Sequence, residues 1–393
     1  MPWKTVNKVE RKLDLVCQMQ RGGSTVTELC RRFQISRKTA YKWLGRYRLH
    51  RLQGLHDQSR KPHRVPGRTN VRWLERLRDL RLKRRTWGAR KLRSRLQSEF
   101  GSQTLPSTAA ISRWLQRWGM TVSRPRRKKG PKLTRRPVRP ARSCNDLWTV
   151  DFKGWFATGD GCRVHPLTVR DLHSRYGLRI GLLRRSNFEQ THREFVKIFR
   201  LYGLPKRIRC DNGSPFGSGG PCGLTRLSAW WIRLGIEVEF ITPGRPGENG
   251  AHEQFHRVYK EEVAKPPAGS FAAQKRRSIK WLQRYNEERP HEALKMKVPA
   301  QFYRRSKRRF PKRLLPWRYP AGWARRWVRG NGEIAWKGTL RFVGEAFILD
   351  HVALVEMKPG SYEVRYGPLL VGLLHEAESG AIRPARYGGK RRI

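Results

Sequence analysis

The sequence WTVDFKG at residues 148–154 ends an apolar, β-branched-rich run on a carboxylate, Asp151. The sequence RCDNG at residues 209–213 repeats this arrangement with Asp211. Downstream, Glu253 lies in a polar–apolar pattern that predicts a helix. Two carboxylates at strand ends and one on a helix, in a strongly basic chain, predict an oxygen cage for hard divalent cations. Paired metals of this kind suit phosphodiester displacement.

The composition points to nucleic acid as the partner. The chain has 393 residues, enough for two to four domains, and 87 Lys and Arg against 30 Asp and Glu give a net charge of +57. Short ribosomal or histone-like proteins are as basic, but 15 Trp and 15 Phe supply cores that such proteins lack. We therefore expect binding to double-stranded DNA, through the phosphate charge.

Cysteine usage and hydropathy bear on the compartment. The six cysteines form no CxxC pair, which favours a reduced protein with no disulfide framework or zinc site. No run of about 18 apolar residues is present, and no secretory signal begins the chain, so we expect no membrane span. The expected location is a bacterial cytoplasm, in association with the nucleoid.

Residues 1–55 predict a helix-turn-helix domain. Thr25 and Glu28 form a capping-box pattern, and Ser36 precedes a basic helix after a short turn. The alternative is a solvated basic helix on an ordinary three-helix bundle. In the helix-turn-helix geometry the early residues of the last helix reach base edges, which makes the candidate DNA-binding residues Arg37, Lys38, Thr39, Tyr41 and Lys42.

A second helical unit and a linker follow. Residues 69–120 predict another helix-turn-helix-like domain, with Ser107 as the cap of its last helix. Residues 121–144 are rich in Lys, Arg and Pro without acids, which predicts an extended linker. This linker either lies along phosphates or acts as a flexible spacer, and the two are compatible.

Residues 145–305 predict a ribonuclease-H-like α/β catalytic core. Strands are expected at 148–155, 162–170 and 176–183, as a meander that turns at 171–175. A helix at 187–202, a strand at 206–210, a helix at 224–234 and a strand at 236–241 follow. The fold class is thus multidomain α+β.

From residue 311 the pattern changes to short strands separated by turn dipeptides such as Asn331-Gly332 and Lys337-Gly338. Strands of this length and spacing predict a small β-barrel at 311–380. Residues 381–393 predict a basic tail without regular structure.

Several stretches together resemble bacterial insertion-sequence transposases with a DDE, retroviral integrase-like core. The resemblance rests on the opening MPWK, residues 28–39, 148–154, 210–216 and 244–257, and YNEERPHEAL at 285–294. It implies that Asp151, Asp211 and Glu253 are catalytic and bind two Mg²⁺ ions, with Mn²⁺ as a substitute. Glu248 competes with Glu253, but it lies in a Gly/Pro loop, a poorer base for a ligand.

The resemblance also implies further contacts with DNA. Arg257 and Lys260 lie four and seven residues after Glu253, on one helix face, where retroviral integrases carry phosphate-contacting lysines; the alternative is a solvated basic face. Lys153 and Asn212 flank the carboxylates and are expected to orient DNA. His252 and His256 favour packing or phosphate contact over zinc, and Asp171 is expected to start a turn.

The function that the resemblance implies is transposition. Such an enzyme binds the ends of a mobile element, hydrolyses a strand to expose a 3′-hydroxyl, and joins that hydroxyl to target DNA by transesterification. The alternatives are a catalytically inactive, transposase-derived DNA-binding protein and a nuclease that cuts without joining. Since two ends must meet, we expect a homo-oligomer; the terminal repeats, target preference, pathway and present activity of the element stay open.

Overall fold

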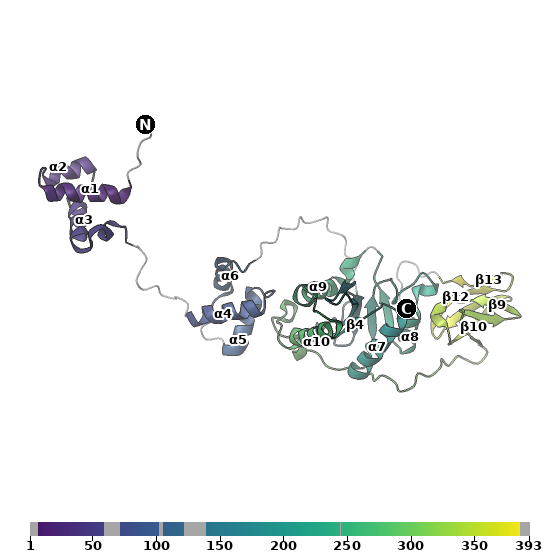
Figure 1. The fold of residues 1–393 in the computed structure, drawn as a ribbon. Helices are drawn as coiled ribbons and strands as arrows, with labels where there is room; N and C mark the ends of the chain where they lie inside the picture. The colour runs from purple at the N-terminus through teal and green to yellow at the C-terminus, as the bar shows by residue number, and fades with distance from the viewer. Residues whose placement is uncertain (1–6, 59–70, 102–104, 122–138, 244, 386–393) are drawn as a thin grey trace. The chain divides into compact units, whose positions relative to one another are not determined.

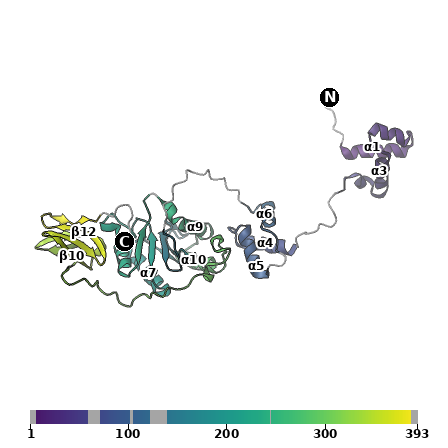
Figure 2. The same ribbon diagram turned by 180° about the vertical axis from the view of Figure 1, so that it is seen from behind.

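The computed structural model describes residues 7–58, 71–101, 105–121, 139–243 and 245–385. They belong to two units, Met1–Thr69 and Asn70–Ile393, which we describe separately (Figure 1; Figure 2 gives the view from behind). The opening MPWK, the linker residues 122–138 and the tail residues 386–393 lie outside the described residues. No helix in the described ranges is long and apolar enough to cross a membrane, and no disulfide links the six cysteines, all of which lie in those ranges.

The first unit is a three-helix domain whose helices begin at side-chain caps. Helices α1 (Lys8–Arg21), α2 (Val26–Phe33) and α3 (Arg37–His50) are followed by a 3-10 turn, η1 (Arg51–Leu55). The predicted capping box is confirmed, because the Thr25 side chain accepts from the Glu28 amide while the Glu28 carboxylate accepts from the Thr25 amide. The buried core comprises Leu15, Val16, Leu29, Cys30, Ala40, Trp43, Leu44 and Leu55.

The second unit begins with another three-helix group: α4 (Val71–Lys83), α5 (Ala89–Phe100) and α6 (Thr108–Arg117). The Ser107 hydroxyl accepts from the Ala110 amide and caps α6, as the sequence predicts. The buried core of this group comprises Leu77, Trp87, Leu92, Leu96, Ile111 and Leu115.

The ribonuclease-H-like core is built on a mixed sheet. Its strands are β1 (Leu147–Phe152), β2 (Phe156–Ala157), β3 (Arg163–Asp171), β4 (Gly177–Leu183), β5 (Arg207–Cys210) and β6 (Glu237–Phe240). Strand β3 pairs antiparallel with β4, β2 and β1, whereas β1–β5 and β5–β6 are parallel. The predicted meander is confirmed, and Asp171 closes its turn by accepting from the amide and hydroxyl of Ser174.

The two faces of this sheet differ in polarity because side chains alternate along each strand. Trp148 and Val150 of β1 join one large apolar cluster, which also holds aromatic residues of α7 (Phe188–Tyr202) and α8 (Arg226–Arg233). The intervening residues of the central strands form a polar face: Thr149 and Asp151 on β1, Thr168 and Arg170 on β3, Arg207 and Arg209 on β5, Glu237 and Glu239 on β6.

Helices of the later core cover the polar face and the edge strand. Helix α9 (Gly250–Tyr259) follows a 3-10 turn, η3 (Pro246–Asn249), and continues into a π-helical turn, η4 (Lys260–Ala264). Helix α10 (Phe271–Glu287) packs on β4, where Trp281 and Tyr285 meet Ile180 and Leu182 in a second apolar cluster. Short 3-10 turns, η5 (Glu292–Leu294) and η6 (Pro299–Gln301), complete the core.

The prediction of a C-terminal β-barrel is wrong for the described residues, since their strands do not close into a barrel. Strands β7 (Ala324–Trp327), β10 (His351–Lys358), β11 (Ser361–Tyr366), β12 (Leu369–His375) and β14 (Arg383–Pro384) form one sheet. Strands β8 (Glu333–Trp336), β9 (Thr339–Phe342) and β13 (Gly380–Ala381) form a second. Hairpin turns fix only neighbouring pairs, and here β7 pairs with β10 rather than β8, which separates the sheets.

The C-terminal strands, yellow in Figure 1, pack against the core through α8 and the 3-10 turns η2 (Pro221–Gly223) and η7 (Glu345–Phe347). Arg233 of α8 forms an ion pair of 2.7 Å with Asp350. The two parts also share the large apolar cluster, which includes Trp231 of the core and Phe347 of the C-terminal part. The first residues of the predicted tail, in β13 and β14, extend the two sheets.

Candidate active site

The register of two parallel strands sets Asp151 and Asp211 side by side. Strand β1 pairs with β5 so that Thr149 stands opposite Arg209. Continued by two residues, this register places Asp151 opposite Asp211 at the carboxyl ends of the strands, on the polar face. Carboxyl ends of parallel strands are where α/β sheets place their ligands.

The electrostatics of Asp151 agree with this placement. Burial raises the pKa of Asp151 to about 7, and the negative charges of Asp211 and Glu253 add to the rise. The amide of Phe152 and the ammonium of Lys153 oppose it in part. Asp151 is therefore close enough to both other predicted carboxylates to be repelled by them.

Asp211 presents an unsatisfied oxygen. Its Oδ1 is buried and makes no hydrogen bond with the described residues, and burial raises the pKa of Asp211. A buried carboxylate oxygen without a partner is costly unless a cation or a donor reaches it. Asn212 has a structural contact instead, because its Nδ2 donates to the Ile241 carbonyl at 2.7 Å.

Glu253 lies on α9, whereas Glu248, the alternative third ligand, stabilises the loop ahead of that helix. The Glu248 carboxylate accepts from the Thr242 amide at 2.9 Å and so closes the loop ahead of the helix. Glu253 is exposed on the first turn of α9. Of the two, Glu253 is the carboxylate left available to a ligand.

A buried cluster of threonines and histidines fastens α9 to the sheet. His252 lies between two hydroxyls, with Nδ1 2.8 Å from Thr149 Oγ1 and Nε2 2.6 Å from Thr168 Oγ1. His256 Nε2 is also 2.6 Å from Thr168 Oγ1, which in turn donates to the Asp151 carbonyl at 3.0 Å. Burial lowers the pKa of both histidines, so both rings are neutral.

One proton assignment satisfies the hydrogen bonds between the hydroxyls and the imidazoles of this cluster. A threonine hydroxyl donates once and accepts twice, so Thr168 donates to the Asp151 carbonyl and accepts from Nε2–H of His252 and of His256. Nδ1 of His252 then accepts from the Thr149 hydroxyl. The sequence predicted packing or phosphate contact for the two histidines, and in this cluster both pack against the sheet. No signal in the sequence marked the two threonines, because threonine is common in strands.

Cations gather beside Asp151. Burial lowers the pKa of Lys153, and repulsion from Lys260 lowers it further, so the two ammonium groups lie near each other. Arg257 and Lys260 are exposed at the end of α9 and the start of η4. Cations on the rim of an acidic pair suit a phosphate backbone that passes across it.

The oxygen donors at the ends of β1 and β5 meet part of the needs of a divalent cation. Asp151 and Asp211 offer oxygen ligands on neighbouring strands, and the unpartnered Oδ1 of Asp211 fits a cation. Within the described ranges, however, no three His, Cys, Asp or Glu side chains already stand as a metal-holding group. The aspartate pair thus fits a metal ion, and Glu253 would have to come closer to join them.

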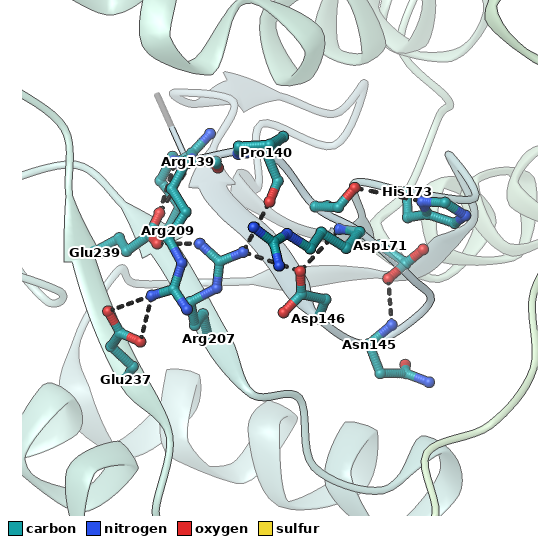
Figure 3. A network of polar contacts seen from close by, with 12 residues as sticks. Arg139, Pro140, Asn145, Asp146, Asp171, His173, Arg207, Arg209, Glu237 and Glu239 are labelled. Atoms are coloured by element: carbon teal, nitrogen blue, oxygen red, sulfur yellow. Dashed lines mark hydrogen bonds and ion pairs between the residues drawn. The ribbon is translucent and has the colours of Figure 1, made fainter. Parts of the chain in front are cut away.

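An ion network under β5 and β6 anchors the end of the linker (Figure 3). Arg207, whose side chain is 2% exposed, donates to Asp146 at 3.0 Å, to the Pro140 carbonyl at 3.0 Å and to Glu239. Arg209 donates to Glu239 at 2.9 Å and to the Arg139 carbonyl at 3.1 Å. Residues 139–146 are thereby tied to the strand that ends at Asp211.

In the first unit, the predicted base-reading residues occupy the first two turns of α3. Arg37, Lys38, Tyr41 and Lys42 are exposed. The Thr39 hydroxyl lies 2.9 Å from that of the capping Ser36, so Thr39 also serves the cap.

Family models match the N-terminal helical domains and the core. Models of the integrase core domain match residues 141–246 and 234–299. A helix-turn-helix domain matches residues 11–63, and a homeodomain-like domain matches residues 39–115.

Two relatives come from insertion elements. An uncharacterised 31.7 kDa protein of insertion element IS407 from Burkholderia multivorans is 28% identical over 253 residues, which is 64% of this chain and 88% of that protein. An uncharacterised 39.2 kDa protein of insertion element IS476 from Xanthomonas euvesicatoria is 28% identical over 281 residues, 71% of this chain and 78% of that protein.

Solved structures of retroviral integrases also align. A simian T-cell lymphotropic virus intasome aligns with a TM-score of 0.37 and 15% identity, over 76% of this chain and 98% of that chain. The HTLV-2 integrase catalytic core domain in complex with magnesium aligns with a TM-score of 0.34 and 15% identity, over 42% of this chain and 100% of that chain. The domain models and the relatives together establish that this chain carries helix-turn-helix domains and an integrase core domain, and that its homologues are insertion-element proteins.

Proposed function

We propose that this protein is a divalent-metal-dependent DNA transposase that cuts the ends of an insertion element and joins them to target DNA. The observation that carries the proposal is the parallel register of β1 and β5, which when continued sets Asp151 opposite Asp211, where burial and the charge of Asp211 raise the pKa of Asp151. Two carboxylates held together against their repulsion suit a cation between them.

Asp151, Asp211 and Glu253 would hold the metal ions. Bound Mg²⁺, or Mn²⁺ in its place, would supply activation of the attacking oxygen and stabilisation of the leaving oxygen at the phosphorus atom. In the cutting step water attacks the phosphodiester, and the strand leaves with a 3′-hydroxyl. In the joining step that hydroxyl attacks a target phosphodiester, so one bond forms as another breaks and no external energy is needed.

The remaining residues position the DNA. Lys153, Arg257 and Lys260 contact phosphates beside the carboxylates. In the first unit, the start of α3 contacts the element end through Arg37, Lys38, Thr39, Tyr41 and Lys42. All of these side chains except that of Thr39 are exposed and available to base edges. Because two ends must be joined, the active form is a homo-oligomer on DNA.

The proposal is tested by strand transfer with the inverted repeats that flank the gene, in Mg²⁺ and in Mn²⁺. We expect wild-type protein to cut and join these ends, and Asp151→Asn to bind them without cutting. Asp160→Asn is the matched control, since Asp160 is an exposed turn carboxylate of the same core. Joining by Asp151→Asn would overturn the site, and wild-type protein that binds the repeats without cutting would be a transposase-derived DNA-binding protein instead.

A further inference from the structure

A cavity of about 470 Å³ lies on another side of α9 from Glu253. From the helix it is lined by Gly250, Ala251, Gln254, Phe255 and Val258. These residues recur at spacings of three and four and so share one helical face. Glu253, Arg257 and Lys260 follow the same kind of spacing on a different face, which makes the cavity separate from the aspartate pair.

Four cations from separate elements converge on this cavity. Lys91 comes from α5, Arg170 from β3, Arg175 from the turn after β3, and Arg289 from the segment after α10. Contacts between the α4–α6 group and the core hold the Lys91 side of the cavity in place. Arg84 pairs with Glu288 at 2.5 Å, and the Ser94 hydroxyl donates to the Met296 carbonyl at 3.1 Å.

Burial and mutual repulsion together outweigh the attraction of the nearby acids for these cations. Burial lowers the pKa of Lys91 to about 8, and the charge of Arg289 lowers it further against the opposing pull of Glu292 and Glu262. Burial and the charge of Arg170 lower the pKa of Arg175. Among the described residues, neither the Lys91 ammonium nor the Arg175 guanidinium forms a hydrogen bond or a close ion pair.

The pKa of His291 indicates that all four cations lie around the same imidazole ring. Burial lowers its pKa to about 3, and each of Lys91, Arg170, Arg289 and Arg175 lowers it further. The ring is therefore neutral, and its Nε2 is buried without a hydrogen-bond partner among the described residues. Nε of Arg170 is buried and unpartnered as well. Two unused polar groups and two unpaired cations thus line the same cavity.

The four cations outnumber the carboxylates around them, because Glu292 lines the cavity and Glu262 pairs with Arg289 at 2.7 Å. Like charges gathered at low dielectric are unfavourable unless a counter-charge lies among them. Guanidinium groups match the oxygens of a phosphate in two-point hydrogen bonds, and a neutral imidazole adds one donor through Nε2. The volume accepts a phosphate group together with its sugar, and the aromatic walls, Phe255 and Tyr285, are compatible with that sugar.

We infer that this cavity binds a phosphate group carried by DNA and so gives DNA a second anchoring point beside α9, the helix that carries Glu253. The residues that would bind the phosphate are Lys91, Arg170, Arg175, Arg289 and His291. The identity of the carrier rests on the proposed function; the binding of a phosphate-type anion rests on the cavity alone. A DNA strand held there and at Arg257 and Lys260 would contact α9 on two faces.

The test measures binding by full-length protein in EDTA, so that its result does not depend on strand transfer. Fluorescence anisotropy with an element-end duplex, over a series of NaCl concentrations, compares wild type with the double variant Lys91→Gln/Arg175→Gln. We expect about tenfold weaker binding, with a salt slope smaller by about 0.9 for each phosphate that the variant no longer neutralises. The matched control is Lys275→Gln/Lys280→Gln, which removes the same charge from exposed positions of α10; we expect less than a twofold change.

A second arm uses inorganic phosphate alone. Phosphate should raise the melting temperature of wild type and of the α10 control above that in NaCl of equal ionic strength, and should leave the Lys91→Gln/Arg175→Gln variant unchanged. If phosphate no longer stabilises that variant while its DNA affinity stays at the wild-type level, DNA is overturned as the carrier. Equal behaviour of the two double variants in both arms would overturn the site. Failure of wild type to cut DNA would affect only the proposed function.

Discussion

Asp151 and Asp211 occupy equivalent positions on neighbouring parallel strands, two residues beyond the paired Thr149 and Arg209. The backbone register, and not any direct bond, holds the two carboxylates together. The sheet core therefore has to be stable enough to bear their repulsion.

Removal of one carboxylate should stabilise the metal-free protein at alkaline pH. The folded state raises the pKa of Asp151 from 3.8 to about 7, so the folded protein binds more protons than the unfolded chain between these values. Stability therefore falls as pH rises through this window, and the full cost is present above pH 7. We expect Asp151→Asn to stabilise the core by roughly 1–2 kcal/mol at pH 8, after allowance for the solvent-exposed quarter of the side chain.

Denaturant unfolding in EDTA measures this difference, which should vanish towards pH 4. The exposed Asp160→Asn serves again as the control and should show no such pH-dependent gain. An Asp151→Asn protein no more stable than wild type at pH 8 would contradict the raised pKa of Asp151.

Glu253 and Glu248 should differ sharply when each becomes glutamine. Glu253→Gln removes a negatively charged oxygen from the proposed metal site and should lower strand transfer by at least about a hundredfold, in line with the cost of losing one preorganised electrostatic group. Glu248→Gln keeps an acceptor for the Thr242 amide and should leave most of the activity. Rates of single-turnover joining decide, and the reverse order of the two variants would move the third ligand to Glu248.

The histidine cluster should matter for catalysis beyond its share of stability. His252→Ala removes the histidine partner of the Thr149 hydroxyl and one of the three contacts of the Thr168 hydroxyl. This costs about 1–3 kcal/mol and loosens the helix that carries Glu253. We expect weaker activation by Mn²⁺ as well as slower joining. His252→Gln, which can still hydrogen-bond, should recover part of both.

Ser278→Ala is the control for that experiment. It removes the 2.8 Å contact between Ser278 of α10 and Tyr259. Tyr259 lies on α9, as His252 does, but away from the carboxylates. The stability of this variant should fall, while the Mn²⁺ dependence should match wild type. An equal shift of Mn²⁺ dependence in both variants would reduce the His252 effect to general loosening of α9.

The buried ion network of Figure 3 should be far more sensitive than its exposed neighbour. Arg207→Met leaves Asp146 and Glu239 without their shared cation and should cost about 3–5 kcal/mol. Arg139→Gln breaks a more exposed pair with Glu237 and should cost at most about 1 kcal/mol. Thermal unfolding of the two variants tests this ranking, and similar costs would contradict the assigned burial.

The first unit should govern which DNA is bound, without governing the chemistry. Arg37→Ala and Lys38→Ala should each cost about 1–3 kcal/mol for the element end if they read bases, with a smaller loss for unrelated DNA. Their Mn²⁺ dependence should stay that of wild type. Equal losses of affinity for both DNAs would mean that these residues contact phosphates and not bases. The control is Arg48→Ala, because Arg48 is exposed at the other end of α3.

Local sequence was sufficient for the elements and for the candidate residues. The capping boxes, the alternation of the strands and the turn residues act over a few positions, and the predicted helices and strands of the core agree with the observed ones to within a few residues. The acidic ends of β1 and β5 could be found in the same way, because each follows its own apolar run. The two-sheet C-terminal part could not be predicted, since pairing of β7 with β10 joins strands that are distant in sequence.

Tertiary structure alone decided what these residues do together. The β1–β5 register sets Asp151 beside Asp211, and no local pattern specifies the register between strands that a long connection separates. Thr149, Thr168 and His252 meet only because α9 crosses β1 and β3. The phosphate cavity likewise exists only where α5 meets the core, because Lys91 and Arg289 lie far along the chain from Arg170 and Arg175, and packing brings them together against their repulsion.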